Sequence, residues 1–160
     1  MSVEVVTKDR RWENTALAEL AEAAFSVTLS HLGLEAGDWD IAILGCNDQQ
    51  IADLNAQFRD KPSATNVLSW PSQERGAEKE GDLPAFPTGD TELGDIAISF
   101  DTCRKEAERS GATLKDHVTH LIVHGVLHLL GYDHERDGDG DLMEATEIAI
   151  LAKLGVPNPY

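Results

Sequence analysis

The chain contains few cysteines and no long apolar segment. Its two cysteines, Cys46 and Cys103, lie far apart and do not form the dense pattern of a small secreted disulfide protein, so we expect reduced thiols. No uninterrupted apolar run approaches the ~20 residues that a membrane helix requires. The charged stretch MSVEVVTKDRRW also lacks the apolar segment of a secretory signal. Together these absences predict a cytoplasmic protein without a membrane span.

Basic residues are also scarce, because 13 Lys and Arg oppose 29 Asp and Glu and give a formal net charge of −16. Such an average disfavours polyphosphate ligands, which bind best at positive potential. Many acids are concentrated in residues 133–147, whereas Arg59 and Lys61 lie well away from them in the sequence. We therefore expect any nucleic acid to bind at a local basic patch, with the acids on the far side of the molecule and a strongly salt-dependent affinity.

Apolar periodicity predicts a single α+β domain over residues 1–160, long enough to bury roughly 70% of its unfolded surface. We expect a small, mixed four-stranded sheet packed against about five helices. The expected strands cover residues 3–6, 39–44, 67–70 and 96–99. The expected helices cover residues 15–32, 47–58, 101–111, 114–130 and 141–154.

Two details of this fold depend on polar and flexible residues. Asn14 or Thr15 is expected to cap the first helix, since short polar side chains accept hydrogen bonds from the first turn. The segment 71–91 is rich in Gly, Pro and Glu and is predicted to be an exposed, mobile loop. A loop of that length in a small domain is usually functional or disordered.

The most informative segment is HGVLHLLGYDH at residues 124–134. His124 and His128 are four residues apart, so on a helix they project from one face about one turn apart. Gly131 is expected where this helix ends, and the chain can then bring His134 back over the helix end. Three imidazoles can hold zinc at the usual Zn–N distance of about 2.0 to 2.1 Å and leave a fourth, open position, as catalytic sites do. We therefore predict one Zn²⁺ per chain at the end of a central helix.

Other residues near this segment leave the ligand set open. His117 and His120 fall on the same quarter of the helix as His124, so either could replace His134 as the third ligand. We favour a position next to the ligands or on the substrate side for both His117 and His120, because four ligands on one straight helix would be spread over about 16 Å. Asp133 either orients an imidazole through its free N–H or is an ordinary turn carboxylate.

The segment lacks the glutamate of the zinc peptidase signature H-E-x-x-H, because Gly125 directly follows His124. A peptidase would therefore need its general base elsewhere. Glycine inside a helix costs about 1 kcal/mol relative to alanine. Gly125 thus predicts that another group approaches the helix backbone closely.

The histidine segment resembles the signature of the YbeY family, bacterial endoribonucleases that cut single-stranded RNA in the maturation of ribosomal RNA. Residues 54–62 and 65–70 are similar to the family's second block, and residues 93–99 resemble its third. Met143 and Glu144 fit the end of the pattern. The resemblance therefore covers most of the chain from residue 54 to residue 147.

Two positions depart from the family pattern. The second block usually reads T-D-V-L-S-F, whereas this chain has Asn66 and Trp70. Asn66 lacks the carboxylate for a metal or base role, but it keeps the capacity to form turns and caps.

The resemblance implies a zinc-dependent endoribonuclease that acts in rRNA maturation and ribosome quality control, with rRNA and the ribosome or its associated factors as partners. Arg59 falls on the arginine that the family uses in catalysis. We expect Arg59 to stabilise the charge that grows on phosphorus, Lys61 to hold the RNA backbone, and His120 to lie near the substrate. Zinc would lower the pKa of its water toward ~7, and the ribose 2′-OH is the alternative nucleophile. No side chain is identified as the general base.

Two other functions are compatible with a three-histidine zinc site. The first is a zinc peptidase that lacks the usual glutamate, since such a site accepts acyl as well as phosphoryl substrates. The second is a non-catalytic ribosome-assembly factor in which zinc fastens the C-terminal helices. A structural zinc of that kind contributes folding energy directly, so its removal would unfold the chain.

Overall fold

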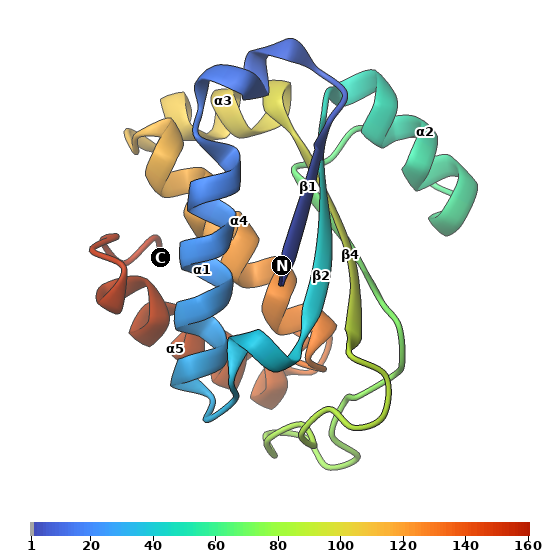
Figure 1. Cartoon of the computed structure of the whole chain (residues 1–160), viewed down its shortest axis with the longest axis vertical. Helices are drawn as coiled ribbons and strands as arrows, with labels where there is room; N and C mark the ends of the chain where they lie inside the picture. Colours follow the sequence, from blue (N-terminus) through green and yellow to red (C-terminus); the bar gives the residue numbers. More distant parts are fainter. Residues whose placement is uncertain (1) are drawn as a thin grey trace.

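The computed structural model describes residues 2–160, which form a mixed β-sheet with most of its helices on one face (Figure 1). The strands are β1 (Val3–Thr7), β2 (Asp40–Cys46), β3 (Val67–Pro71) and β4 (Glu92–Ser99). The helices are α1 (Leu17–His31), α2 (Asp48–Arg59), α3 (Phe100–Ser110), α4 (Leu114–Leu129) and α5 (Asp137–Lys153). Two short 3₁₀ helices, η1 (Arg10–Asn14) and η2 (Ala36–Asp38), complete the elements of the described residues.

The strands lie in the order β1-β2-β4-β3. β1, β2 and β4 run parallel, and β3 runs antiparallel to β4 at one edge. The β-branched residues of the central strands lie on the face that packs against the main core. Ile43 and Ile96 are almost completely buried, and so is Ile98.

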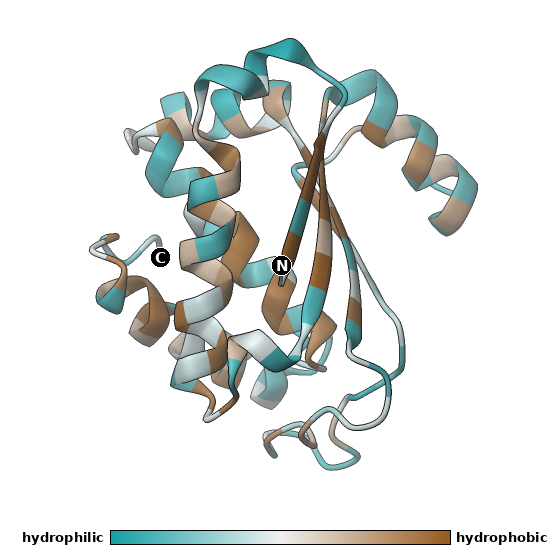
Figure 2. Ribbon diagram, viewed as in Figure 1, coloured by the Kyte–Doolittle hydropathy of each residue, from teal (hydrophilic) through white to brown (hydrophobic). Residues whose placement is uncertain are grey.

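The helices cover the two faces of the sheet unequally. Figure 1 shows α1, α4 and α5 together on one face and α2 alone on the other. Figure 2 shows apolar residues concentrated along the strands and on the helices beside them. The main core therefore lies between the sheet, α1 and α4, where Phe25, Ile122 and Leu127 are fully buried. This places α4, which carries the histidine segment, directly against the sheet.

The predicted α+β domain with four strands and five helices is confirmed for the described residues. The predicted cap of the first helix is wrong, because Asn14 lies in η1 and the N-cap of α1 is Ala16 with φ of 56°. η1 forms because Asp9 accepts a hydrogen bond from the backbone of Arg11 and the indole of Trp12 donates to the Cys46 carbonyl at 2.8 Å.

Other boundaries differ from the prediction as well, and β4 begins at Glu92 rather than residue 96. Trp39 does not belong to β2, because its backbone N–H donates to the Ala36 carbonyl and closes η2. α5 begins at Asp137 rather than residue 141, and it includes Gly138 and Gly140. The carboxylate of Glu80 accepts the backbone N–H of Gly138, which stabilises a helix start that glycine disfavours.

The expected exposed loop at 71–91 is only partly exposed. Arg75 is 8% exposed and donates through Nη1 to the Leu129 carbonyl at the end of α4, at 2.8 Å. The loop is therefore anchored to the element that carries the histidines. None of the helices among residues 2–160 is both long and apolar enough to cross a membrane.

Candidate metal centre

Three imidazoles meet where α4 ends. His124 and His128 project from the same face of the helix, and Gly131, with φ of 102°, reverses the chain so that His134 returns beside them. One ring nitrogen from each histidine lies within 4.8 Å of the other two. Among the described residues this is the only group of His, Cys, Asp and Glu with such spacing. The structure therefore brings together the three predicted ligands.

The outward ring nitrogens of two histidines are held by hydrogen bonds. His124 Nδ1 donates to Glu147 Oε1 at 2.5 Å, and His128 Nδ1 donates to the Tyr132 carbonyl at 2.9 Å. A carbonyl can only accept, so His128 must carry its proton on Nδ1, and the carboxylate imposes the same tautomer on His124. Their Nε2 lone pairs therefore face one another at 2.9 Å. Two lone pairs this close repel unless a cation lies beside them, so the donor set fits a metal ion.

Burial keeps the site in the protonation state that binds a metal. Burial and the neighbouring His124 and His134 lower the pKa of His128 to about 4, so its imidazole is neutral at pH 7. Burial alone would raise the pKa of Glu147, but the nearby His120 and the hydrogen bonds from His124 and Tyr160 outweigh it and hold the pKa at about 2. Glu147 is therefore an ionised acceptor, although it is only 1% exposed.

A glycine inside α4 predicts that another group approaches the helix backbone closely, and this approach is found at Gly125. A Cβ on Gly125 would lie 3.1 Å from Ile96 Cδ1 of β4, so the approaching group is the sheet. Position 125 is buried and faces the core. A glutamate there would be buried against β4, away from the site where a peptidase needs its base.

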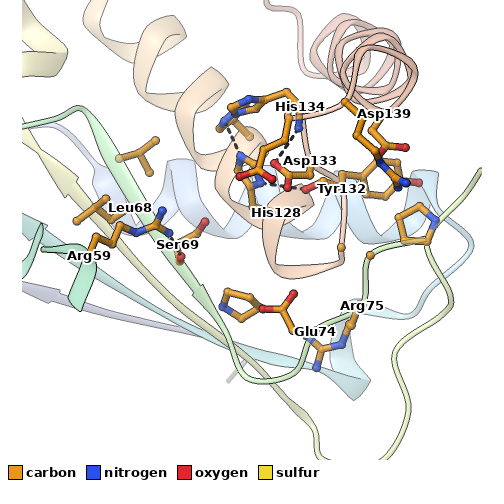
Figure 3. Close-up of a pocket in the computed structure, with 18 of the residues that line it drawn as sticks. Arg59, Leu68, Ser69, Glu74, Arg75, His128, Tyr132, Asp133, His134 and Asp139 are labelled. Carbon is orange, nitrogen blue, oxygen red and sulfur yellow. Dashed lines mark hydrogen bonds and ion pairs between the residues drawn. The ribbon is translucent and has the colours of Figure 1, made fainter. Parts of the chain in front are cut away.

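The histidines open onto a pocket of about 890 Å³, which is lined by several separate parts of the chain (Figure 3). Arg59 comes from the last turn of α2 and donates through Nη2 to the Ser69 carbonyl of β3 at 2.9 Å. Lys61 lies two residues further on and is exposed. Figure 3 shows Arg59 across the pocket from His128 and His134, so the predicted basic pair does share a pocket with the histidines.

The expectation that the acids lie on the far side of the molecule is wrong. Acidic residues line the wall of the pocket formed by the β3–β4 loop, the turn after α4 and α5. They are Glu74, Asp82, Asp133, Glu135 and Asp139. The opposite wall, from α2 to β3, carries Arg59 and Lys61 among neutral polar residues such as Asn55 and Ser63. Arg75 and Arg136 also line the acidic side, but the five carboxylates outnumber them. The pocket therefore has one basic wall and one wall that is acidic on balance.

The remaining candidates lie around the ligands rather than among them. Asp133 lines the pocket, but its carboxylate accepts the backbone N–H of His134 at 2.8 Å, while the two Nδ1 groups described above have other partners. Among the described residues, His120 is not part of the pocket lining, and its Nε2 lies 3.9 Å from Glu147 Oε2. His117 lies further along α4 and bonds Glu106 at 2.8 Å.

Asn66 has a structural partner that explains the amide. Its Nδ2 donates to Glu106 Oε1 at 3.0 Å, and its Oδ1 accepts the backbone N–H of Val67 at 2.6 Å. An aspartate at this position would place a second carboxylate against Glu106. Asn66 avoids this repulsion, because its neutral amide donates a hydrogen bond to Glu106. The same carboxylate also bonds His117.

Glu147 and Tyr160 are parts of the site that sequence reasoning missed. Glu147 lies at the end of the acidic region 133–147, whose acids the sequence predicts to lie on the far side of the molecule. A signal was present, because Glu147 falls on the same stripe of α5 as the buried residues Met143, Ile150 and Leu151. A carboxylate at an apolar position of an amphipathic helix indicates a buried partner. Tyr160 has no comparable signal.

Comparisons with known proteins agree over nearly the whole chain. A family profile described as "Endoribonuclease YbeY" matches residues 2–155. A protein named Endoribonuclease YbeY from Ruegeria sp. (strain TM1040) is 56% identical, over 100% of this chain and 96% of its own. One from Bartonella quintana (strain Toulouse) is 40% identical, over 100% and 97%. The solution structure of TM1509 from Thermotoga maritima has a TM-score of 0.58 at 20% identity, covering 96% of this chain and 91% of that one, and supports the fold.

Proposed function

Because this chain belongs to the YbeY family of endoribonucleases, hydrolases of RNA phosphodiester bonds, we propose that it cleaves single-stranded RNA with Zn²⁺ held by His124, His128 and His134. The proposed substrate is ribosomal RNA, which is cut in the cytoplasm during maturation and ribosome quality control. The proposed partners are the ribosome or its associated factors. The observation that carries the proposal is the histidine cluster with its Nε2 lone pairs turned inward, open to a pocket that Arg59 also lines.

The residues around the pocket supply binding and orientation. A bound zinc ion would supply Lewis acidity toward a phosphoryl oxygen and a lowered pKa for water. Arg59 uses one guanidinium nitrogen to bind the Ser69 carbonyl, which fixes the side chain and leaves other N–H groups for a phosphate. Arg59 thereby stabilises the charge that grows on the phosphoryl oxygens, and Lys61 holds an adjacent phosphate.

The RNA strand must lie along the basic wall of the pocket, because the acidic wall repels phosphates. Single-stranded RNA can adapt to this one-sided track, since its backbone is flexible. Neutral polar groups such as Ser63 and Thr65 lie along the same wall and can hydrogen-bond sugars and base edges. The one-sided charge is consistent with a preference for single strands over a stiff duplex.

The test compares cleavage of a labelled single-stranded RNA by the zinc-loaded wild type, His128→Ala and Arg59→Ala, with circular dichroism to verify folding. We expect no cleavage by His128→Ala. Arg59→Ala should retain zinc and lose about 100-fold or more in rate, as when a charge-stabilising donor is removed. Arg104→Ala is the matched control, since Arg104 is an exposed arginine of α3 outside the pocket lining. Equal cleavage by wild type and His128→Ala would refute the proposal.

The same samples separate the two alternatives. A non-catalytic assembly factor predicts that removal of zinc unfolds the chain, whereas an enzyme leaves a folded, inactive apoprotein. A peptidase predicts peptide cleavage without RNA cleavage, and the buried position of Gly125 disfavours it. Product ends identify the nucleophile, because attack by the 2′-OH leaves a 2′,3′-cyclic phosphate and attack by water does not.

A further inference from the structure

The last residue of the chain reaches the hydrogen bonds that support the metal centre. After α5 the chain folds back toward α4, and the hydroxyl of Tyr160 donates to Glu147 Oε2. Asn158 fixes this end, because its Oδ1 accepts the backbone N–H of Tyr160 at 2.9 Å. The tyrosine ring also packs edge-on against His120, with 5.6 Å between ring centroids.

Glu147 is thus held from two sides. Oε1 accepts from His124 Nδ1 at 2.5 Å, and Oε2 accepts from Tyr160. A buried ionised carboxylate is costly unless hydrogen bonds satisfy its oxygens. Among the described residues, the phenol is the only hydrogen-bond donor to Oε2, since His120 Nε2 lies 3.9 Å away, beyond hydrogen-bond distance.

We propose that Tyr160 is a positioning residue of the metal centre, which acts through Glu147. Its hydroxyl fixes the carboxylate in the orientation that accepts the Nδ1 proton of His124, and so keeps the Nε2 lone pair of His124 directed at the metal. Partners that orient a metal-bound histidine in this way affect metal affinity strongly. The inference rests on the proposed metal binding by His124, but it does not depend on the RNA reaction.

The alternative is that Tyr160 only covers the end of α5 by packing. Tyr160→Phe separates the two, because it removes the hydroxyl and keeps the ring against His120. Packing predicts no change in metal affinity. Positioning predicts a loss that depends on the carboxylate of Glu147.

The experiment is a competition titration with a chromophoric zinc chelator, using wild type, Tyr160→Phe, Glu147→Gln and the double variant. We expect Glu147→Gln to weaken zinc binding by about 10- to 100-fold, and Tyr160→Phe, one step further from the metal, by roughly 3- to 10-fold. In the Glu147→Gln background, Tyr160→Phe should change nothing further. Thr146→Val is the control, because it removes a hydroxyl beside Glu147 that bonds only the Leu142 carbonyl.

Wild-type zinc affinity in Tyr160→Phe would overturn the proposal, and so would an equal loss in both backgrounds. A second readout needs no metal. Long-range ¹H–¹⁵N spectra of the apoprotein should show His124 protonated on Nδ1 in the wild type and a mixture of tautomers in Tyr160→Phe. An unchanged His124 tautomer would contradict the role. If the wild type binds zinc but does not cut RNA, the proposed function fails while this inference stands.

Discussion

Single glycine residues set the distance between the histidine helix and the sheet. Gly94 in β4 has φ of 144°, and a Cβ there would lie 2.2 Å from the Trp70 carbonyl and 2.8 Å from Leu129 Cδ2. The contact at Gly125 in α4 is less tight, because its added Cβ would lie 3.1 Å from the side chain of Ile96. Gly94 is therefore required by the close contact of β4 with β3 and the end of α4, and Gly125 favours the approach of α4 to the sheet.

Gly94→Ala should consequently be severely destabilising. The substitution combines a backbone conformation that alanine disfavours with a clash against backbone atoms, which cannot move as a side chain can. We expect a loss of about 3 kcal/mol or more in the free energy of unfolding, measured by urea denaturation. Gly37→Ala is the control, because nothing lies within 4 Å of its added Cβ. A Gly94→Ala variant as stable as the control would contradict this account.

The buried imidazole of His128 should make the metal-free protein sensitive to mild acid. Its pKa is about 4 in the folded state, against an ordinary value of 6.5, so the unfolded chain binds more protons between these values. Stability therefore falls as the pH drops below 6.5, by about 3 kcal/mol at most, because one pKa unit corresponds to about 1.4 kcal/mol. Thermal melts of the apoprotein at pH 7 and pH 5 should show the decrease. His128→Gln, which does not titrate, should show a smaller decrease, and an equal one would exclude His128 as the cause.

At the scale of elements, the segment between β3 and β4 is fastened to α5. The guanidinium of Arg136 donates to the carbonyls of Ala77 and Glu78, at 2.8 and 3.0 Å. In return, Glu80 and Asp139 each accept a backbone N–H from the other segment. These contacts hold the acidic wall of the pocket in place, because α5 and the loop both contribute to it.

Arg136→Gln should loosen this loop without unfolding the protein. The variant loses the two contacts to loop carbonyls and the ion pair with Asp139, all of which are at the surface. We expect trypsin to cleave after Lys79 several-fold faster than in wild type, because proteolysis follows local opening. Arg136→Gln itself removes one site at which trypsin cleaves. Arg104→Gln, on α3, also removes one such site and therefore serves as control. An unchanged cleavage rate at Lys79 would show that other contacts hold the loop.

The elements that the sequence predicted are those with a local signal. The ligands on α4 follow from helical spacing, which places His124 and His128 on one face whatever surrounds them. The early start of α5 could not be predicted, because it depends on Glu80 from a distant segment. For Glu147 the apolar stripe of α5 indicated a buried carboxylate, but its partner, a histidine 23 residues away, could not be predicted. Local periodicity identifies the metal ligands, and only tertiary structure identifies what orients them.

At the scale of the whole molecule, charge is the main constraint on function. A net charge of −16 repels RNA at long range, and acids line one wall of the pocket itself. Salt screens that repulsion, because the Debye length is about 10 Å at 0.1 M. Binding therefore depends on the few cations of the basic wall, chiefly Arg59 and Lys61.

RNA binding should accordingly depend on salt less steeply than the sequence predicted, because only two cations of the described residues lie on the basic wall. Two phosphate contacts on a single strand predict a slope of about −1.4 in log K against log salt, so affinity should fall roughly sevenfold between 50 and 200 mM. Salt also screens the repulsion between RNA and the acidic surface, which makes the slope still shallower. Lys61→Gln should lower the slope by about 0.7, whereas Lys105→Gln, on the exposed side of α3, should leave it unchanged. Fluorescence anisotropy with a labelled RNA single strand measures the salt slope of each variant. A slope that responds equally to Lys61 and Lys105 would mean that the RNA follows the overall charge of the molecule rather than the basic wall of the pocket.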